Sequence, residues 1–206
     1  MLKRPMQIRL YHNLKDDFHC FQACLKMVLD YFGENYSFKR LDKITGFKKD
    51  KLTWSTKGLL YLSQNGYDII DVCNFDFKRF AREGEKYLKW YYSPDAYKYQ
   101  NEYSNFISEQ KLIKKALDSK IKLVNKKNIN IKLETKKYPD YAIIVSVNNF
   151  ILNKEKGYDS HLVVVTKISS NYVFLNDPGL PARKRKVPLK LFNKALNDEF
   201  ILIKKK

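Results

Sequence analysis

The stretch "DDFHCFQACLKMVLDYFG", residues 16–33, decides how this chain folds. It starts on polar residues and then becomes apolar almost throughout, with a cysteine at the transition. From Cys20 onward its polar residues are spaced by four and fall on one narrow stripe of a helix: Gln22, Lys26 and Asp30. A helix with so little polar surface is expected to be buried, and Gly33 is a suitable C-cap. The pattern therefore predicts a central buried helix headed by Cys20.

The whole composition fits one folded domain spanning residues 1–206. Hydrophobic residues make up 44% and aromatic residues 15% of the chain, which argues against disorder. No apolar run reaches about 18 residues, and the basic residues 1–10 lack the apolar core of a secretion signal. Three cysteines do not make a disulfide framework. We therefore expect a reduced, cytoplasmic protein without a membrane segment.

The net charge of +18 raises the question of a nucleic-acid partner. The lysines are spread over nearly every segment of the chain. The densest basic runs do not interleave aromatic residues and glycines as RNA-binding motifs do; they are residues 126–127, 183–186 and 204–206. We interpret the charge as a solvated basic surface and expect no specific nucleic-acid partner.

Helices and strands are unevenly distributed along the chain. In the first half the pattern predicts a short strand at 7–11, helices at 37–44, 55–63, 76–92 and 104–117, and a strand at 67–73. In the second half it predicts strands at 141–150, 161–168, 172–177 and 199–203, with a helix at 189–196. Helices mostly first and an antiparallel sheet mostly second indicate an α+β fold.

One predicted hairpin brings a histidine close to an aspartate. Its two strands are joined by the tight turn at residues 169–171. If Ile168 pairs with Tyr172, the residue opposite His161 lies about two positions from Asp177. Both side chains then lie at the open end of the hairpin. Taken alone, the pair is equally well explained as a strand-end histidine and a turn-forming Asp-Pro-Gly.

A nucleophilic cysteine needs what this hairpin supplies. It requires a base to take its proton and a carboxylate or amide to hold that base in one tautomer. It also requires a depressed pKa, which the start of a helix favours through its dipole and free N–H groups. A buried helix packed on the sheet could bring Cys20 to His161 and Asp177.

Two blocks of the sequence resemble the bacteriocin-processing cysteine peptidases, papain-like domains that cut leader peptides for peptide exporters. "CFQACLKMVLDYFG" (20–33) is similar to their Cys-Gly-x-Ala-(Ala/Cys)-Leu-x-Met-Val-Leu-x-Tyr-x-Gly segment. "GYDSHLVVVTKISSNYVFLNDPG" (157–179) is similar to their His-(Phe/Leu)-Val-Val block followed by Asp-Pro-Gly, with the same sixteen-residue step from His161 to Asp177. "VPLKLFNKAL" (187–196) resembles their closing strand and short helix.

The resemblance implies a papain-like fold and a peptide or protein substrate, without a cofactor. It makes Cys20 the nucleophile, His161 the base and Asp177 the residue that orients the base. Residues 74–138 do not align with the family, and we expect them to be a helical insertion. The oligomeric state is not indicated.

The chain departs from the family pattern at two places. Phe21 follows the nucleophile where the family has glycine, which adds bulk beside the thiol. The glutamine that stabilises the family's oxyanion lies six residues before the cysteine, where this chain has Leu14. Asn13 is the nearest amide, and it could donate to the oxyanion if the loop carries one extra residue.

Two other functions stay open beside the peptidase. One is an acyltransferase or amidase that uses the same triad, with an amine in place of water. The other is a catalytically weak pseudo-peptidase that binds peptides, which the two departures and the basic surface favour.

The neighbouring residues have plainer interpretations. Cys24 and Cys73 are predicted to be core thiols, and His19 is predicted to be exposed beside the helix start. No cysteine or histidine spacing supports a zinc site. The aromatic-rich residues 87–103 could form a wall for substrate, but a packing surface is favoured.

Overall fold

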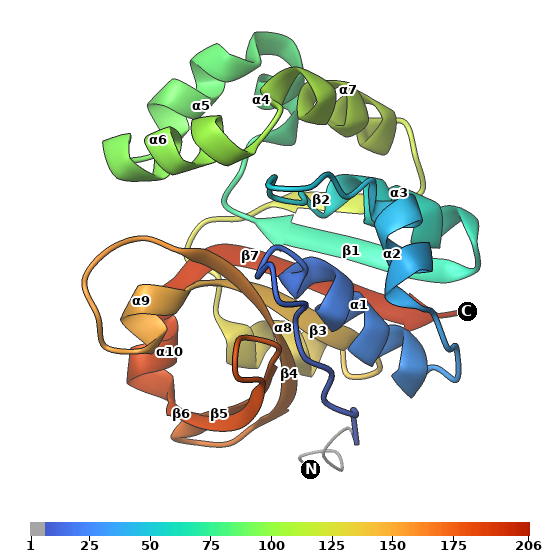
Figure 1. The fold of residues 1–206 in the computed structure, drawn as a ribbon, viewed down its shortest axis with the longest axis vertical. Coiled ribbons are helices and arrows are strands. Elements are labelled where there is room, and N and C mark those ends of the chain that lie inside the picture. The colour runs from blue at the N-terminus through green and yellow to red at the C-terminus, as the bar shows by residue number, and fades with distance from the viewer. Residues whose placement is uncertain (1–6) are drawn as a thin grey trace.

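A seven-stranded sheet forms the centre of the computed structural model, which describes residues 7–206 (Figure 1). Its strand order is β2-β1-β7-β3-β4-β5-β6, and every neighbouring pair is antiparallel except β1 and β2. The strands are β1 (Tyr67–Cys73), β2 (Lys122–Asn125), β3 (Ala142–Asn148), β4 (Ser160–Ile168), β5 (Tyr172–Asp177), β6 (Arg183–Pro188) and β7 (Leu196–Lys205). The predicted α+β fold with a mostly antiparallel sheet is confirmed, and β1 and β2 from the middle of the chain extend that sheet.

Helices cover both faces of the sheet and one end of the molecule. One face carries α1 (Cys20–Tyr31), α2 (Phe38–Thr45) and α3 (Thr56–Gln64). The other carries α8 (Ile131–Lys137), α9 (Asn149–Leu152) and α10 (Leu189–Ala195). A separate group with its own apolar core lies at the top of Figure 1: α4 (Phe77–Glu83), α5 (Glu85–Tyr91), α6 (Pro94–Tyr103) and α7 (Phe106–Leu117). Within residues 7–206 no helix is both long enough and apolar enough to cross a membrane.

The central helix α1 begins at Cys20, as predicted, and packs on β4. The thiol of Cys24 donates to the backbone oxygen of Leu162 at 3.3 Å, which fixes the helix against this strand. Gly33 follows the helix with φ +83°, a conformation that favours glycine. Gln22, on the predicted polar stripe, is fully buried and donates to two threonine hydroxyls.

The strand predicted at residues 7–11 is absent, since this segment joins no ladder of the sheet. It is held by single contacts instead. The side chain of Asn176 donates to the backbone oxygen of Ile8 at 2.9 Å, and the Asn13 N–H donates to the Pro178 oxygen at 2.7 Å. In the sequence, a short segment held by isolated hydrogen bonds cannot be told apart from a short edge strand.

The helix predicted at 76–92 is two helices, α4 and α5, separated by Gly84 at φ +56°. The sequence prediction also missed α6, although Pro94 at its first turn and the Ser93 side chain as N-cap are ordinary start signals.

The sequence suggested that residues 74–138 are helical throughout. In the structure they also contain the strand β2, which lies parallel to β1. β2 has only four residues, too few for a clear alternating pattern. The helix α8 in this segment and the strand β6 were also missed. That the segment is an insertion relative to the family stays a prediction.

The bulky Phe21 beside the thiol is accommodated by a glycine on α3. The Phe21 ring is 1% exposed, and a Cβ added at Gly58 would lie 2.9 Å from its Cε1 atom. No other residue type fits at position 58 without moving that ring. The departure from the family pattern at Phe21 is thus matched by the absence of a side chain at Gly58.

We expect the Gly58→Ala substitution to lower the free energy of unfolding by about 1 kcal/mol in urea denaturation. Alanine favours a helix over glycine by about 0.5–1 kcal/mol, but overpacking a core costs about 1–3 kcal/mol. The Phe21→Leu variant serves as the matched background, because it removes the ring atoms that the new Cβ would meet. In that background the loss should vanish; an equal loss in both backgrounds would rule out the Phe21 ring as its cause.

Candidate active site

A cleft of about 330 Å³ opens where the start of α1, the start of β4 and the helices α5 and α6 meet. Cys20 and His161 both line it. Strands β1 and β7 also contribute to its lining, so residues far apart in the sequence share one cavity. The sheet therefore positions the cleft, and the helices close it.

Cys20 is the first residue of α1 and is partly exposed to the cleft. The preceding residue, His19, is 3% exposed, so its predicted exposure is wrong. Its two ring nitrogens lie 2.9 Å from Asp16 Oδ1 and 3.2 Å from Asp42 Oδ1, and its ring contacts the Phe47 ring in a tilted arrangement at 3.9 Å between centroids. His19 thus anchors the start of the helix and holds Cys20 in place.

His161 and Asp177 meet as the hairpin predicted. His161 Nε2 lies 2.8 Å from Asp177 Oδ1, and both side chains are buried. The detailed register differs near the turn, because Ile168 pairs with Val173 and not with Tyr172. A bulge between Val165 and Lys167 then shifts the pairing by one residue and restores the predicted register at the open end.

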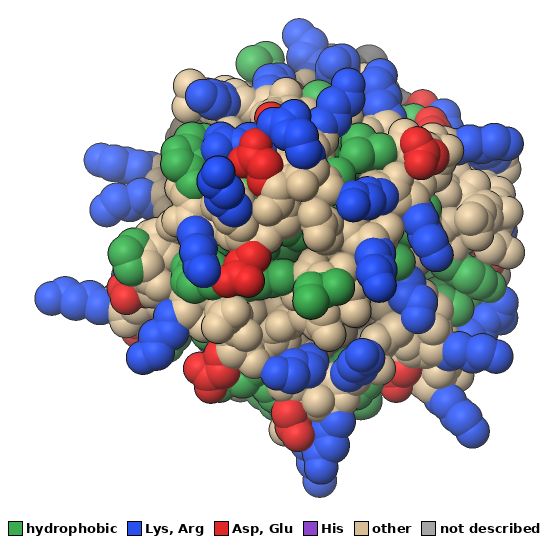
Figure 2. Space-filling model, turned by 90° about the horizontal axis from the view of Figure 1, so that it is seen from above, with side chains coloured by type: hydrophobic (Ala, Val, Ile, Leu, Met, Phe, Trp, Pro, Cys, Tyr) green, Lys and Arg blue, Asp and Glu red, His purple; other side chains and the backbone are tan. Residues whose placement is uncertain are grey.

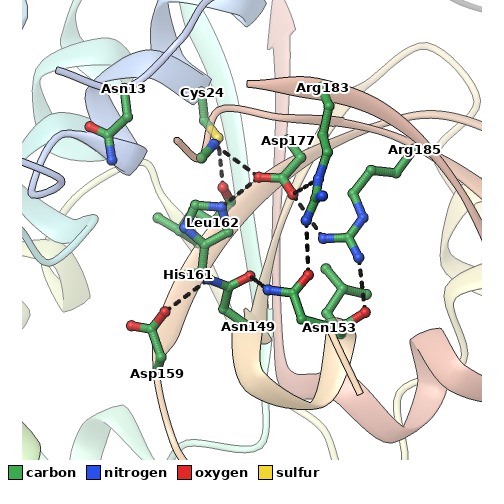
Figure 3. A network of polar contacts seen from close by, with 12 residues as sticks. Asn13, Cys24, Asn149, Asn153, Asp159, His161, Leu162, Asp177, Arg183 and Arg185 are labelled. Carbon is green, nitrogen blue, oxygen red and sulfur yellow. Dashed lines mark hydrogen bonds and ion pairs between the residues drawn. The ribbon is translucent and has the colours of Figure 1, made fainter. Parts of the chain in front are cut away.

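The carboxylate of Asp177 is surrounded by donors (Figure 3). Its Oδ1 also accepts from the Gly179 N–H at 3.0 Å, and its Oδ2 accepts from Arg185 Nη1 at 2.9 Å. Burial disfavours the charged form, but the hydrogen bonds from His161, Gly179 and Arg185 together hold the pKa of Asp177 well below its usual range. Asp177 is therefore a permanent negative charge behind His161.

His161 is held in one orientation, and its neighbours favour its protonated form. Burial alone would lower its pKa, but the hydrogen bonds to Asp177 and Cys20 raise the pKa of His161 from 6.5 to about 10. Since Nε2 faces Asp177, Nδ1 is the nitrogen directed to Cys20. An imidazolium beside a helix start is the environment that stabilises a thiolate.

Asn13 lies in the loop before α1 and is 1% exposed. Its Oδ1 accepts from the backbone N–H groups of Leu14 and His19 at 2.9 and 2.8 Å. Its Nδ2 donates at 2.7 Å to Asp17, which lines the cleft. The amide therefore links the loop to the start of α1, and its contribution to an oxyanion site stays a prediction.

The other two cysteines are buried, as predicted. Cys24 is fully buried, and burial raises the pKa of its thiol well above the ordinary value. Cys73 is 5% exposed and packs in the core of the α4–α7 group, where it also borders the cleft. None of the three cysteines, all within residues 7–206, forms a disulfide.

The aromatic-rich segment packs in a core and also lines the cleft. Several of its rings pack in the core of the α4–α7 group, as favoured. Others line the cleft: Tyr91, Tyr92, Tyr99 and Tyr103. Trp54 joins this wall, and its Nε1 donates to Gln100 and Ser104 at 3.2 and 3.0 Å.

Sequence reasoning missed Arg185, the cation that holds Asp177. It was part of the dense basic run at 183–186 and was interpreted as solvated surface. In the structure this run is the edge strand β6, with Arg183 opposite Asp177 and Arg185 opposite Leu175. Arginines two residues apart lie on the same face of a strand, and that spacing was the available signal. In the part of the chain that the structure describes, no group of three His, Cys, Asp or Glu side chains could hold a metal ion.

Comparison with known proteins rests on structure alone, since no family model and no curated protein sequence matches the chain. One similar structure is a double-glycine-motif protease from an AMS/PCAT transporter, in complex with the leader peptide. It is 13% identical, with a TM-score of 0.55 over 99% of this chain and 96% of that one. Another is the peptidase domain of ComA, a bifunctional ABC transporter of Streptococcus involved in quorum sensing. It is 14% identical, with a TM-score of 0.55 over 97% of this chain and 100% of that one.

This chain has the double-glycine peptidase fold. The predicted papain-like architecture is confirmed, and the structures match the kind of peptidase that the two sequence blocks resemble.

We expect the Cys20→Ala substitution to lower the pKa of His161 below about 10, because the bond to Cys20 is among the contacts that raise it. Imidazole NMR titration is suited to the measurement, since the chain has only three histidines. The resonances of His12 serve as an internal control. An unchanged His161 titration in the variant would contradict direct coupling of the imidazole to the thiol.

Proposed function

We propose that this protein is a papain-like cysteine peptidase that hydrolyses peptide bonds through Cys20, His161 and Asp177. The observation that carries the proposal is that Cys20 and His161 line one cleft and that the buried Asp177 is hydrogen-bonded to His161. A partly exposed thiol heads a helix, this thiol contributes to the raised pKa of an imidazole in the same cleft, and a carboxylate holds the imidazole at 2.8 Å. This is the set of groups that thiol acyl transfer requires.

In the first step the Cys20 thiolate attacks the carbonyl carbon of the peptide bond and forms an S–C bond. The C–N bond then breaks, and the His161 imidazolium gives its proton to the leaving amine. Acylation removes the contribution of Cys20 to the raised pKa of His161, so the imidazole becomes able to act as a base. It takes a proton from water as the water attacks the thioester, which releases the carboxylic acid and restores the ion pair.

The negative oxygen formed in each step needs hydrogen-bond donors. The first N–H groups of α1 have no partner within the helix, so the Cys20 N–H is one donor. We propose the Asn13 side chain as the second. Its Oδ1 is fixed by the His19 N–H directly before Cys20, which holds the amide near the start of the helix.

Leader peptides are the substrate class we propose first. The protease of the AMS/PCAT transporter was solved with a leader peptide, and the present chain shares its fold. We propose that cleavage takes place in the cytoplasm, because a thiolate nucleophile is preserved from oxidation there.

Acyl transfer to an amine is the second candidate. The same thioester would be resolved by an amine in place of water, and acidic side chains in the cleft favour the entry of a protonated amine: Asp17, Asp71, Asp159 and Glu199. A pseudo-peptidase is less well supported, because the bulk of Phe21 is accommodated by Gly58 and the three catalytic groups are complete.

We expect iodoacetamide at a pH of about 6 to label Cys20 almost alone. An ordinary thiol, with a pKa of about 8.5, is protonated at that pH, whereas a thiolate paired with an imidazolium reacts. Cys24 and Cys73 are buried. Peptide mapping by mass spectrometry identifies the adduct, and the His161→Ala variant should lose the selectivity. Equal labelling of all three cysteines, or none before denaturation, would refute the nucleophile.

We expect the protein to cleave a synthetic leader peptide after a Gly-Gly pair, and the Cys20→Ala variant to leave it intact. The Asn13→Ala variant should lower kcat by about 10²–10³ with KM almost unchanged, because the lost contact exists only in the transition state. Liquid chromatography of the products measures both. A change in KM alone would assign Asn13 to binding, and cleavage by the Cys20→Ala variant would exclude the proposed mechanism.

A further inference from the structure

The cleft is lined by acidic side chains, whereas the surface of the molecule is mostly basic. The chain has 40 Lys and Arg residues against 22 Asp and Glu, and basic side chains are spread over the face shown in Figure 2. No lysine or arginine is among the described residues that line the cleft, but four carboxylic acids are: Asp17, Asp71, Asp159 and Glu199. This cavity therefore differs in chemistry from the surface around it.

Two of these acids, Asp71 and Glu199, form what we call the acidic floor of the cleft. Asp71 lies on β1 and Glu199 on the neighbouring strand β7. Asp71 pairs with Ile201, and Glu199 pairs with Cys73, so the two acids are diagonal neighbours on one face of the sheet. This face also carries Ser146, whose strand pairs with Glu199 from the other side.

The acidic floor lacks a counter-charge in this structure. Asp71 is 5% exposed, and its Oδ1 has no hydrogen-bond partner. Glu199 accepts from the Ser55 hydroxyl at 3.3 Å. Burial raises the pKa of Asp71 well above the ordinary value, and the nearby Glu199 raises it further. A buried oxygen without a partner costs free energy unless a ligand supplies a donor.

The walls around the floor suit a cation. Ten aromatic side chains line the cleft: Phe18, Phe21, Trp54, Phe75, Phe77, Tyr91, Tyr92, Tyr99, Tyr103 and Tyr158. Tyr92 and Tyr158 lie close enough to Glu199 for its charge to raise their pKa values, although burial is the larger cause. Aromatic faces attract ammonium and guanidinium groups, and this attraction increases in a desolvated site.

We propose that the acidic floor binds an ammonium or guanidinium group of the substrate, in the same cavity as the Cys20 thiol. The bound group supplies N–H donors to Asp71 and a positive charge to Glu199, and the aromatic walls cover its alkyl chain. The inference rests on the proposed function, because that function makes the occupant of this cavity a substrate. A lysine or arginine side chain near the scissile bond is the source we favour, and an amine acceptor is the other source of the same chemistry.

The test measures binding to the Cys20→Ala variant by calorimetry, so that it does not depend on turnover. Acetylated pentapeptide amides carry one lysine at each position in turn, and a matched set carries norleucine, which has a neutral chain in its place. We expect the lysine peptide to bind at least about tenfold more tightly at one position, a difference of about 1.4 kcal/mol. Asp71→Asn and Glu199→Gln, added singly and together, should remove this preference.

Glu155→Gln is the matched control, because it makes the same change of charge at an exposed residue that does not line the cleft. It should leave the lysine preference unchanged. The substitutions at the floor keep the side-chain size, and circular dichroism verifies the fold of each variant. Two results would overturn the proposal. One is a lysine preference that persists in the folded Asp71→Asn and Glu199→Gln variants. The other is that the Cys20→Ala variant shows no lysine preference and binds no n-butylamine.

The two sources are separated with n-butylamine. If it binds at the floor and the wild-type protein forms a butylamide product, the site holds the amine acceptor, and the ammonium site is supported. If only the lysine peptides bind, the site holds a peptide side chain. A failure of Cys20 to react with iodoacetamide, with the lysine preference intact, would refute the proposed peptidase and still support the cation site.

Discussion

The contact between the buried helix α1 and strand β4 is the constraint on which the site depends. The Cys24 thiol donates to the backbone oxygen of Leu162, the residue directly after His161. One turn earlier on the same helix, Cys20 is thereby fixed beside the imidazole. The helix can approach the sheet closely because the side chains that face it are apolar and buried. The fold and the chemistry thus share one interface.

From that interface a line of alternating charge runs to the edge of the sheet. Arg185 on β6 holds Asp177, and Asp177 holds His161, whose other nitrogen faces Cys20. Each group is bonded to an opposite charge, which compensates for the burial of the carboxylate. Cys20 from the first part of the chain thus meets His161 and Asp177 from the last part, and the edge strand β6 holds Asp177 in place.

The sequence predicted those parts of the site that rest on local pattern. The apolar run predicted α1, and the hairpin register predicted that His161 meets Asp177. The acidic floor was hidden, because Asp71 and Glu199 are single polar residues within apolar strands and become neighbours only through the pairing of β1 with β7. The role of Arg185 was hidden for a related reason, since the spacing of Arg183 and Arg185 indicates one shared face of a strand but not the carboxylate that this face meets. Pairings between distant strands are the information that local pattern lacks.

The position of β7 has a consequence for how the protein matures. This strand, residues 196–205, lies between β1 and β3, so the two sides of the sheet join only when it enters. A nascent chain that lacks β7 has neither a continuous sheet nor one wall of the cleft. Because sequence-distant strands pair late in folding, the thiol acquires its binding cavity only after synthesis has passed this strand. The cavity beside Cys20 is thus completed only by a strand near the end of the chain.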